Sequence, residues 1–206
     1  MSKSTKENIL MSSFRLFLQK GYKNTTMSQL VKVSGVSKGA FYHYFSSKEE
    51  LFDHALEQYF YALASPVINF EADAERTFME NFQGYLYTRN QAVEKMRQEL
   101  EIDFNANYTG VVMEAMQLFE HHKKRSLELL DEELLTYQNI ILLAQQSGEL
   151  RADVEAELLA KHLYFMLDGF KLHVMVLGDL NTEVYTQLNG LLQQFYTLIK
   201  NPSFQV

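Results

Sequence analysis

Residues 21–52 read GYKNTTMSQLVKVSGVSKGAFYHYFSSKEELF, and this stretch decides the fold of the start of the chain. It predicts two short helices separated by a tight turn at Ser34-Gly35-Val36, the first beginning at the Thr25–Thr26 pair and the second capped by Ser37. A turn of three or four residues that contains glycine is typical of a helix-turn-helix, whose second helix enters the DNA major groove.

The second helix of this pair has two faces. Phe41, Tyr44 and Phe45 recur at i, i+3 and i+4 and are expected to be buried. The outward face offers a cation for phosphate or guanine, a close backbone approach, a methyl group for thymine and two hydrogen-bond donors. A helical hairpin that merely packs would show the same period, so the period alone does not establish DNA binding. The outward residues are Lys38, Gly39, Ala40, Tyr42 and His43.

Charge is distributed unevenly along the chain. The whole chain carries −7, but residues 1–50 hold eight basic and three acidic residues and so carry +5, which leaves −12 for the rest. A basic head on an acidic body is expected of a protein that meets phosphates at one end. Thr26 and Lys48 lie at predicted helix N-termini, where backbone N–H groups favour a phosphate.

The quoted stretch resembles the DNA-binding head of TetR/AcrR-family regulators. The resemblance covers about the first 55 residues, with mild departures at Val31 and Ser34. It implies phosphate contacts by Thr26, Tyr42 and Lys48. It also implies that Ser37, Lys38, Gly39, Ala40 and His43 lie near the bases, and that dimers bind (pseudo)palindromic double-stranded DNA operators. The matching residues are Gly21, Tyr22, Thr25, Thr26, Gly35, Val36, Ser37, Lys38, Gly39, Tyr42, Tyr44, Phe45, Ser47, Lys48, Glu49 and Leu51.

The remainder of the chain predicts further helices and an all-α fold. The first four helices are expected after Ser4 or Thr5 as far as Gly21, from the Thr25–Thr26 pair, from Ser37 to Tyr44, and from Ser46 to about Leu63. Later helices are expected at roughly 73–88, 90–104, 109–124, 126–147, 153–177 and 182–200. We therefore expect a DNA-binding domain at 1–50 and a helical ligand-binding and dimerisation domain at 51–206.

The last two helices are candidates for a homodimer interface. Residues 147–176, SGELRADVEAELLAKHLYFMLDGFKLHVMV, resemble the start of the penultimate helix in many TetR/AcrR members, where the last two helices form a four-helix bundle across the dimer. A heptad-like apolar stripe is also what an ordinary core helix shows. The expected interface residues are Leu159, His162, Leu163, Met166, Phe170, Leu191, Leu192 and Phe195.

A set of aromatic and methionine side chains is a candidate pocket for a small-molecule effector. Such a lining suits an adaptable, largely apolar site, although each member taken singly is equally typical of a core. The candidate residues are Phe78, Phe82, Tyr85, Met96, Phe104, Tyr108, Met113, Met116, Phe119 and Tyr137.

Several other classes of function find no support in the sequence. The chain has no cysteine, which excludes disulfides and thiol catalysis, and it shows no catalytic or cofactor motif, so we expect neither an enzyme nor a bound cofactor. His121 and His122 are adjacent on a predicted helix and should diverge, with no partner at metal-site spacing, so no metal site is expected. No stretch resembles a signal peptide or membrane span, and we expect a cytoplasmic protein with no membrane partner.

These observations together predict a dimeric repressor. The protein would leave a palindromic operator when a small apolar or amphipathic effector binds the body. The alternative is a transcriptional activator, or a regulator controlled by a protein partner instead of a small molecule.

Overall fold

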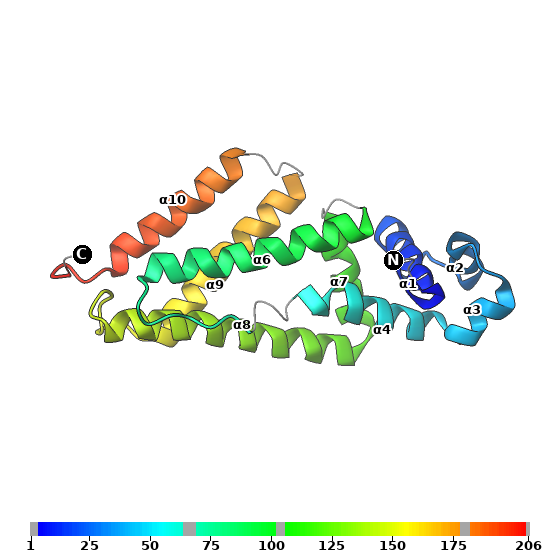
Figure 1. Cartoon of the computed structure of the whole chain (residues 1–206), viewed down its shortest axis with the longest axis horizontal. Helices are drawn as coiled ribbons and strands as arrows, with labels where there is room; N and C mark the ends of the chain where they lie inside the picture. The colour runs from blue at the N-terminus through cyan, green and yellow to red at the C-terminus, as the bar shows by residue number, and fades with distance from the viewer. Residues whose placement is uncertain (1–3, 64–68, 102–105, 178–181, 205–206) are drawn as a thin grey trace. The chain divides into compact units, whose positions relative to one another are not determined.

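The fold is described from a computed structural model that covers residues 4–63, 69–101, 106–177 and 182–204. These residues form helices, with no strand among them, so the predicted all-α class is confirmed. They divide into two compact units (Figure 1). Unit 1 contains residues 1–65 and 92–126, and unit 2 contains residues 66–91 and 127–206.

Unit 1 is built on four capped helices at the start of the chain. Ser4 caps α1 (Thr5–Lys20) through a reciprocal capping box with Glu7, and Gly21 ends that helix at φ 78°. Ser37 and Ser47 accept hydrogen bonds from backbone N–H groups in the first turns of their helices. The helices that follow α1 are α2 (Met27–Ser34), α3 (Lys38–Tyr44) and α4 (Lys48–Tyr59), with the short 3-10 helix η1 (Tyr61–Leu63) after them.

Later segments of the chain complete unit 1. They are the end of α6 (Phe78–Leu100), all of α7 (Ala106–Leu118) and the first residues of α8 (Glu120–Gln146). The core of the first four helices contains Phe14, Phe17, Phe41 and Phe52, each fully buried. Phe17 and Phe52 meet edge to face with ring centroids 4.9 Å apart, a favoured aromatic geometry.

Unit 2 contains the start of α6, most of α8, and the helices α9 (Ala156–Leu177) and α10 (Thr182–Ile199). Its core gathers buried residues from all four helices. The buried carboxylate of Glu149 accepts a hydrogen bond from the Phe78 N–H at 2.7 Å, and so closes the open N-terminus of α6. The backbone of Glu149 in turn accepts from Asn201, which follows α10.

The structure corrects the sequence analysis in three places. The break expected at Thr88-Arg89-Asn90, between helices at 73–88 and 90–104, lies inside the single helix α6, because this tripeptide carries no helix-breaking residue. The break expected near Arg125 lies at Phe119 instead, between α7 and α8. Tyr44, expected to be buried, is exposed. The two compact units also divide the chain elsewhere than at 50/51, and the DNA-binding boundary at that point stays a prediction.

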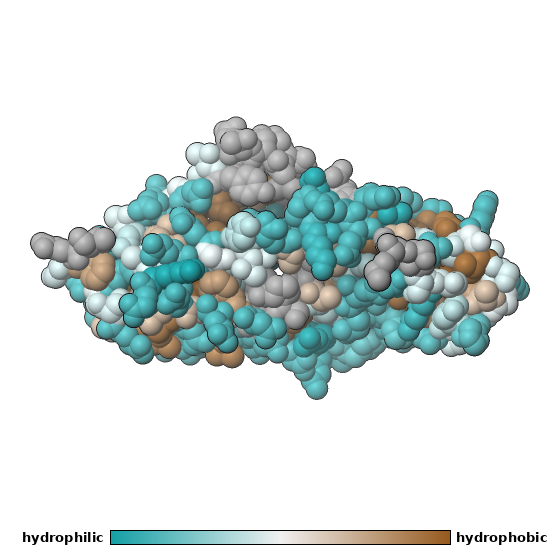
Figure 2. All heavy atoms as spheres, in the orientation of Figure 1, coloured by the Kyte–Doolittle hydropathy of each residue, from teal (hydrophilic) through white to brown (hydrophobic). Residues whose placement is uncertain are grey.

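Hydrophilic residues cover most of the face shown in Figure 2, with hydrophobic patches between them. Among the described residues, no helix is long and apolar enough to cross a membrane.

Candidate nucleic-acid interface

The outward face of α3 presents polar side chains on a rigid apolar support. Phe41 and Phe45 are fully buried, whereas Lys38, Tyr42 and His43 are exposed. The Lys38 ammonium lies 5.9 Å from the centre of the Tyr42 ring, so a cation and a phenol group lie side by side on this face. The arrangement can contact both phosphates and base edges.

The N-terminus of α3 is fixed by its cap and by the turn before it. The Ser37 hydroxyl accepts a hydrogen bond from the Ala40 N–H at 3.2 Å. Gly35 has a left-handed backbone conformation, with φ 69° and ψ 6°, which a glycine adopts without strain. The Asn8 side-chain amide donates to the Ser34 carbonyl at 3.1 Å and ties this turn to α1. Gly39 is exposed and Ala40 half-buried, as a close backbone approach requires.

The expected phosphate contacts at the two helix N-termini have different surroundings. Thr26 is exposed and caps α2 in a reciprocal box with Gln29. Lys48 is partly buried, and its ammonium donates to the carbonyls of Tyr22 and Thr25, both at 2.9 Å. That ammonium also lies 4.1 Å from the centre of the Tyr22 ring. Two of its three protons therefore hold the loop before α2, and its phosphate contact stays a prediction.

The loop between α1 and α2 is also held by α7. The Glu114 carboxylate accepts hydrogen bonds from the backbone N–H groups of Tyr22, at 2.7 Å, and Lys23, at 3.0 Å. Gly21 makes room for it, because a Cβ at that position would lie 3.0 Å from a Glu114 oxygen. Sequence reasoning missed Glu114, which lies more than 90 residues from its partners and belongs to no motif.

Residues 9–55, which contain α2, α3 and the start of α4, match the family model described as bacterial regulatory proteins, tetR family. This segment is therefore similar in sequence to the DNA-binding head of the TetR family. The resemblance expected from the sequence is thereby confirmed.

The chain is similar to two curated relatives and to one solved structure. It is 43% identical over 68 residues to the HTH-type transcriptional regulator YerO of Bacillus subtilis (strain 168), a match covering 33% of this chain and 24% of that protein. It is 21% identical over 174 residues to the HTH-type transcriptional repressor DhaR of Mycobacterium sp. (strain GP1), covering 83% of this chain and 82% of DhaR. The crystal structure of reduced Escherichia coli NemR superposes with a TM-score of 0.66 at 20% identity, over 97% of this chain and 99% of that chain.

These comparisons differ in how much of each protein they cover and in what they show. The chain spans about a quarter of the length of YerO, and the likeness to NemR shows the fold alone. All three proteins are transcription regulators and none is an enzyme, as expected for this chain.

The residues expected to line an effector pocket fall into two groups. Phe78, Phe82, Tyr85 and Tyr137 are fully buried together in the core of unit 2. In unit 1, Met96 is buried, Met116 and Phe119 are half-buried, and Met113 is half-exposed. Phe104 lies outside the described residues, as does the side chain of Tyr108. The structure brings four of these ten residues together, and the pocket stays a prediction.

Unit 2 contains a half-buried polar cluster that includes two of those four residues. The Tyr85 hydroxyl donates to the Glu133 carboxylate, which also pairs with Arg89 at 2.9 Å. Burial, the largest single influence, lowers the pKa of Arg89, but the Glu133 carboxylate and the nearby tyrosine hydroxyl groups together raise it above its usual value. The Tyr137 hydroxyl is buried near Tyr85 yet makes no hydrogen bond of normal geometry. An unsatisfied buried hydroxyl is costly, so this cluster is the best candidate for a ligand contact.

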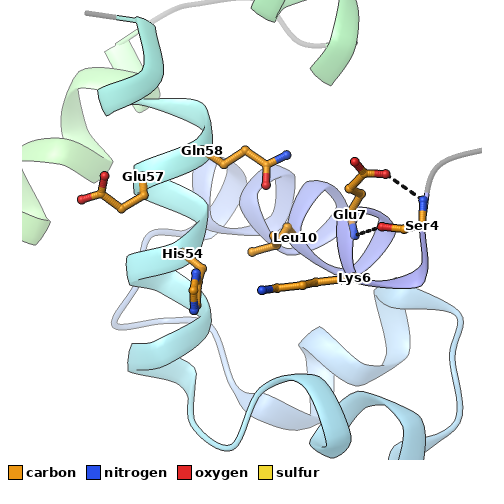
Figure 3. A pocket seen from close by; sticks show the side chains of 7 residues that line it. All are labelled: Ser4, Lys6, Glu7, Leu10, His54, Glu57 and Gln58. Carbon is orange, nitrogen blue, oxygen red and sulfur yellow. Dashed lines mark hydrogen bonds between the residues drawn. The ribbon is translucent and has the colours of Figure 1, made fainter. Parts of the chain in front are cut away.

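A surface hollow in unit 1 lies elsewhere (Figure 3). It is formed by the first turns of α1 and the second half of α4, and in Figure 3 the Lys6 side chain extends toward His54. None of the ten expected pocket residues lines it. The lining residues are Ser4, Lys6, Glu7, Leu10, His54, Glu57 and Gln58.

The expected dimer residues include several that the single chain already buries. Leu159, Leu163 and Leu192 are in the core of unit 2. Met166, Phe170, Leu191 and Phe195 are half-buried, and His162 is exposed. Among the side chains of α9 that the structure describes, the large apolar ones that are exposed are Leu158, Phe165 and Leu172.

Two adjacent histidines in unit 1 converge on one carboxylate. The Nε2 atoms of His121 and His122 lie 3.3 Å and 2.8 Å from the same Oδ1 atom of Asp53. The expectation that these rings diverge and lack an acidic partner is therefore wrong. Burial is the main cause of a lowered pKa of His122, which favours the neutral imidazole. No local pattern could reveal this cluster, because Asp53 lies 68 residues from His121.

Replacing Glu114 by glutamine tests its hold on the loop before α2. The change removes charge-assisted hydrogen bonds to the Tyr22 and Lys23 N–H groups, an expected loss of about 1–3 kcal/mol. We expect thermal unfolding followed by circular dichroism to show a Tm lower by about 2–4 °C per kcal/mol lost. Glu120→Gln is the control, since the Glu120 side chain is 86% exposed. Equal Tm values for the two variants would contradict the assigned role.

Proposed function

We propose that this protein is a homodimeric transcriptional repressor that binds a palindromic double-stranded DNA operator through α3. The observation that carries the proposal is the face of α3, where Lys38, Tyr42 and His43 are exposed over the buried rings of Phe41 and Phe45. The +5 charge of residues 1–50 supports it, because cationic residues that meet phosphates release counterions. The relative DhaR is named a repressor. Binding to chromosomal DNA implies action in the cytoplasm.

The contacts on DNA follow from the chemistry of each side chain. Lys38 and His43 can donate to guanine or phosphate oxygens, and the Ala40 methyl group can pack against thymine. Tyr42 and Thr26 supply hydroxyl donors for phosphates that fix the register of the helix in the groove. Lys48 contributes the third proton of its ammonium to a phosphate while its other two hold the Tyr22 and Thr25 carbonyls.

A second copy of the chain is the proposed partner of the exposed face of α9. Leu158, Phe165 and Leu172 recur every seven residues and remain 48%, 59% and 50% exposed. A seven-residue apolar repeat suits packing against another helix in a bundle, and a single chain leaves it facing solvent. His162 lies on the same helix, one turn from Leu158, and is also exposed. We call Leu158, Phe165 and Leu172 the α9 stripe.

The proposed effector site is the aromatic and polar cluster in unit 2. Tyr85, Tyr137, Glu133 and Arg89 surround it, and the Tyr164 ring lies 5.9 Å from that of Tyr137. Apolar rings would bury the body of a ligand, and the Tyr137 hydroxyl would gain the hydrogen bond that it lacks. The chemistry fits a small amphipathic molecule with an aromatic or alicyclic body.

Release from the operator requires that the effector bind two conformations with different affinity. The same chain offers a mechanical link at α7, since Glu114 holds the backbone of the loop that precedes α2. A shift of α7 would move this loop and with it the spacing of the two recognition helices. Operators are read only at a spacing of about one helical turn, roughly 34–36 Å, or a multiple of it.

Operator binding is tested first by removing side chains from the α3 face. In a mobility-shift assay on DNA upstream of the protein's own gene, Lys38→Ala should cost about 1–3 kcal/mol of binding free energy. Tyr42→Phe should weaken binding by about five- to tenfold, because it removes one hydrogen bond. Lys161→Ala makes the same charge change in unit 2 and should bind as wild type does. The logarithm of the wild-type affinity should fall linearly with that of the salt concentration. Wild-type affinity in both α3 variants would contradict the assigned face.

The dimer is tested at the centre of the α9 stripe. Phe165→Glu places a charge where two apolar faces would meet, and we expect a monomer by size-exclusion chromatography with light scattering at micromolar concentration. Tyr87→Glu is the matched control, because Tyr87 is 66% exposed on α6. If Phe165→Glu elutes with the same mass as wild type and that mass is a dimer, the dimer uses another face.

The effector site is tested with the fluorescent amphipathic probe anilinonaphthalene sulfonate. Wild type should bind it saturably and lose operator affinity as the probe is added. Tyr137→Phe removes one hydroxyl group and should weaken probe binding by about fivefold. Tyr87→Phe, which alters an exposed tyrosine, should leave it unchanged. Identical probe binding by Tyr137→Phe and wild type would place the site elsewhere.

A further inference from the structure

Asp53, His121 and His122 form a compact group of metal-ligating atoms in unit 1. One donor atom from each residue lies within 4.8 Å of the others, and no other group of this kind was found among the described residues. Asp53 comes from the middle of α4, and both histidines come from the first turn of α8. Asp53 is half-buried, His121 is exposed and His122 is 2% exposed, so the group is reached from solvent on one side.

The convergence of two adjacent histidines has a local cause at the junction of α7 and α8. Phe119 directly follows α7, and its N–H donates to the Ala115 carbonyl at 2.9 Å. The Phe119 carbonyl accepts from the N–H groups of His122 and Lys123 at the start of α8. The two rings therefore leave the first turn of a new helix. Their centroids are 4.3 Å apart and their planes are tilted by 42°, so they lie against each other and face α4 together.

We propose that Asp53, His121 and His122 bind one divalent transition-metal ion, such as Zn²⁺ or Co²⁺. Two imidazole nitrogens and a carboxylate oxygen are a donor set that these ions prefer, with the fourth position left to water. Mg²⁺ and Ca²⁺ prefer all-oxygen ligands, so the two nitrogens select against them. Both Nε2 atoms already lie within hydrogen-bond distance of Asp53 Oδ1. A metal ion would take the place of the two Nε2 protons, and each neutral imidazole would carry its proton on Nδ1 instead.

Tyr61 supports the His122 imidazole from the side away from Asp53. Its hydroxyl lies 3.0 Å from His122 Nδ1 and 3.3 Å from the His122 carbonyl oxygen. Without metal, the His122 Nε2–H donates to Asp53 and Nδ1 accepts from the Tyr61 hydroxyl. When Nε2 binds a metal ion, Nδ1 carries the proton and donates to the Tyr61 oxygen, whose own proton turns to the carbonyl. Such an outer partner fixes the tautomer and orientation of a ligating histidine.

A metal ion at this position would join α4 to α8. The helix α4 begins at Lys48, four residues after the recognition helix α3 ends, and α8 continues from unit 1 into unit 2. Metal binding would therefore fix α4 against the start of α8 and alter operator affinity. This last step rests on the proposed function, whereas metal binding itself does not.

The test measures metal binding by chelator-treated, tag-free full-length protein. Wild type should bind one Co²⁺ per chain with visible d–d absorption, and one Zn²⁺ per chain in equilibrium dialysis. His121→Gln should weaken both by more than about tenfold, because losing a ligand costs at least as much as losing an outer partner. Its side chain is 56% exposed, so the variant should fold normally by circular dichroism. His54→Gln removes an exposed histidine next to Asp53 and should bind as wild type does.

Tyr61→Phe separates ligation from a merely structural role. It leaves all three ligands in place and should keep the stoichiometry of one while weakening Zn²⁺ binding by about tenfold. Absence of a Co²⁺ absorption band together with no bound Zn²⁺ at tens of micromolar metal would overturn the site. Equal affinity in His121→Gln and wild type would overturn it too. Operator affinity that is the same in chelator and in Zn²⁺ would overturn the coupling alone, and loss of operator binding in both conditions would count against the proposed function instead.

Discussion

A positively charged and a negatively charged side chain bind opposite sides of the Tyr22 backbone. The conformation of the DNA-binding head depends on these two contacts. Lys48 donates to the Tyr22 carbonyl, while Glu114 accepts from the Tyr22 N–H. Because the Tyr22 ring also lies under the Lys48 ammonium and against the rings of Phe52 and Phe119, α1, α4 and the α7–α8 junction meet at one residue. Charge-assisted hydrogen bonds in a partly buried setting are among the stronger polar contacts in a protein, so this loop has little freedom of its own.

Because the loop before α2 is held in this way, a movement of α7 also moves the loop. If α7 shifts, the Glu114 carboxylate must either carry the Tyr22–Lys23 backbone with it or leave the N–H groups of these two residues without this partner. Moving the loop together with α7 costs less free energy than breaking these hydrogen bonds, and α2 starts only a few residues after the loop. Gly21 contributes to the same contact, because its positive φ and missing Cβ let the Glu114 carboxylate approach the backbone.

The parts of the fold that local chemistry determines could be predicted from the sequence. Ser4, Thr26, Ser37 and Ser47 each cap the helix that follows, and Gly21 and Gly35 end the helices before them. The predictions that failed and the contacts that were missed depend on partners that are distant in the sequence. Residue Tyr44 shares the period of Phe41 and Phe45 yet finds no partner helix, and Asp53 meets His121 and His122 only because α4 and α8 pack together. Periodicity records which positions are apolar, not what covers them.

The helix α9 shows the same limit most clearly. One of its faces, with Leu159 and Leu163, is buried in unit 2, and the α9 stripe on the other remains exposed. Both faces are apolar, so a sequence pattern cannot distinguish the face in the core from the exposed face that we propose as the dimer surface. Tyr164, between them in sequence, lies against Tyr137 of the proposed effector site. In the proposed function, a ligand that moved Tyr137 would therefore displace the helix that also carries the proposed dimer surface, so ligand binding and dimer geometry would be coupled through a single helix.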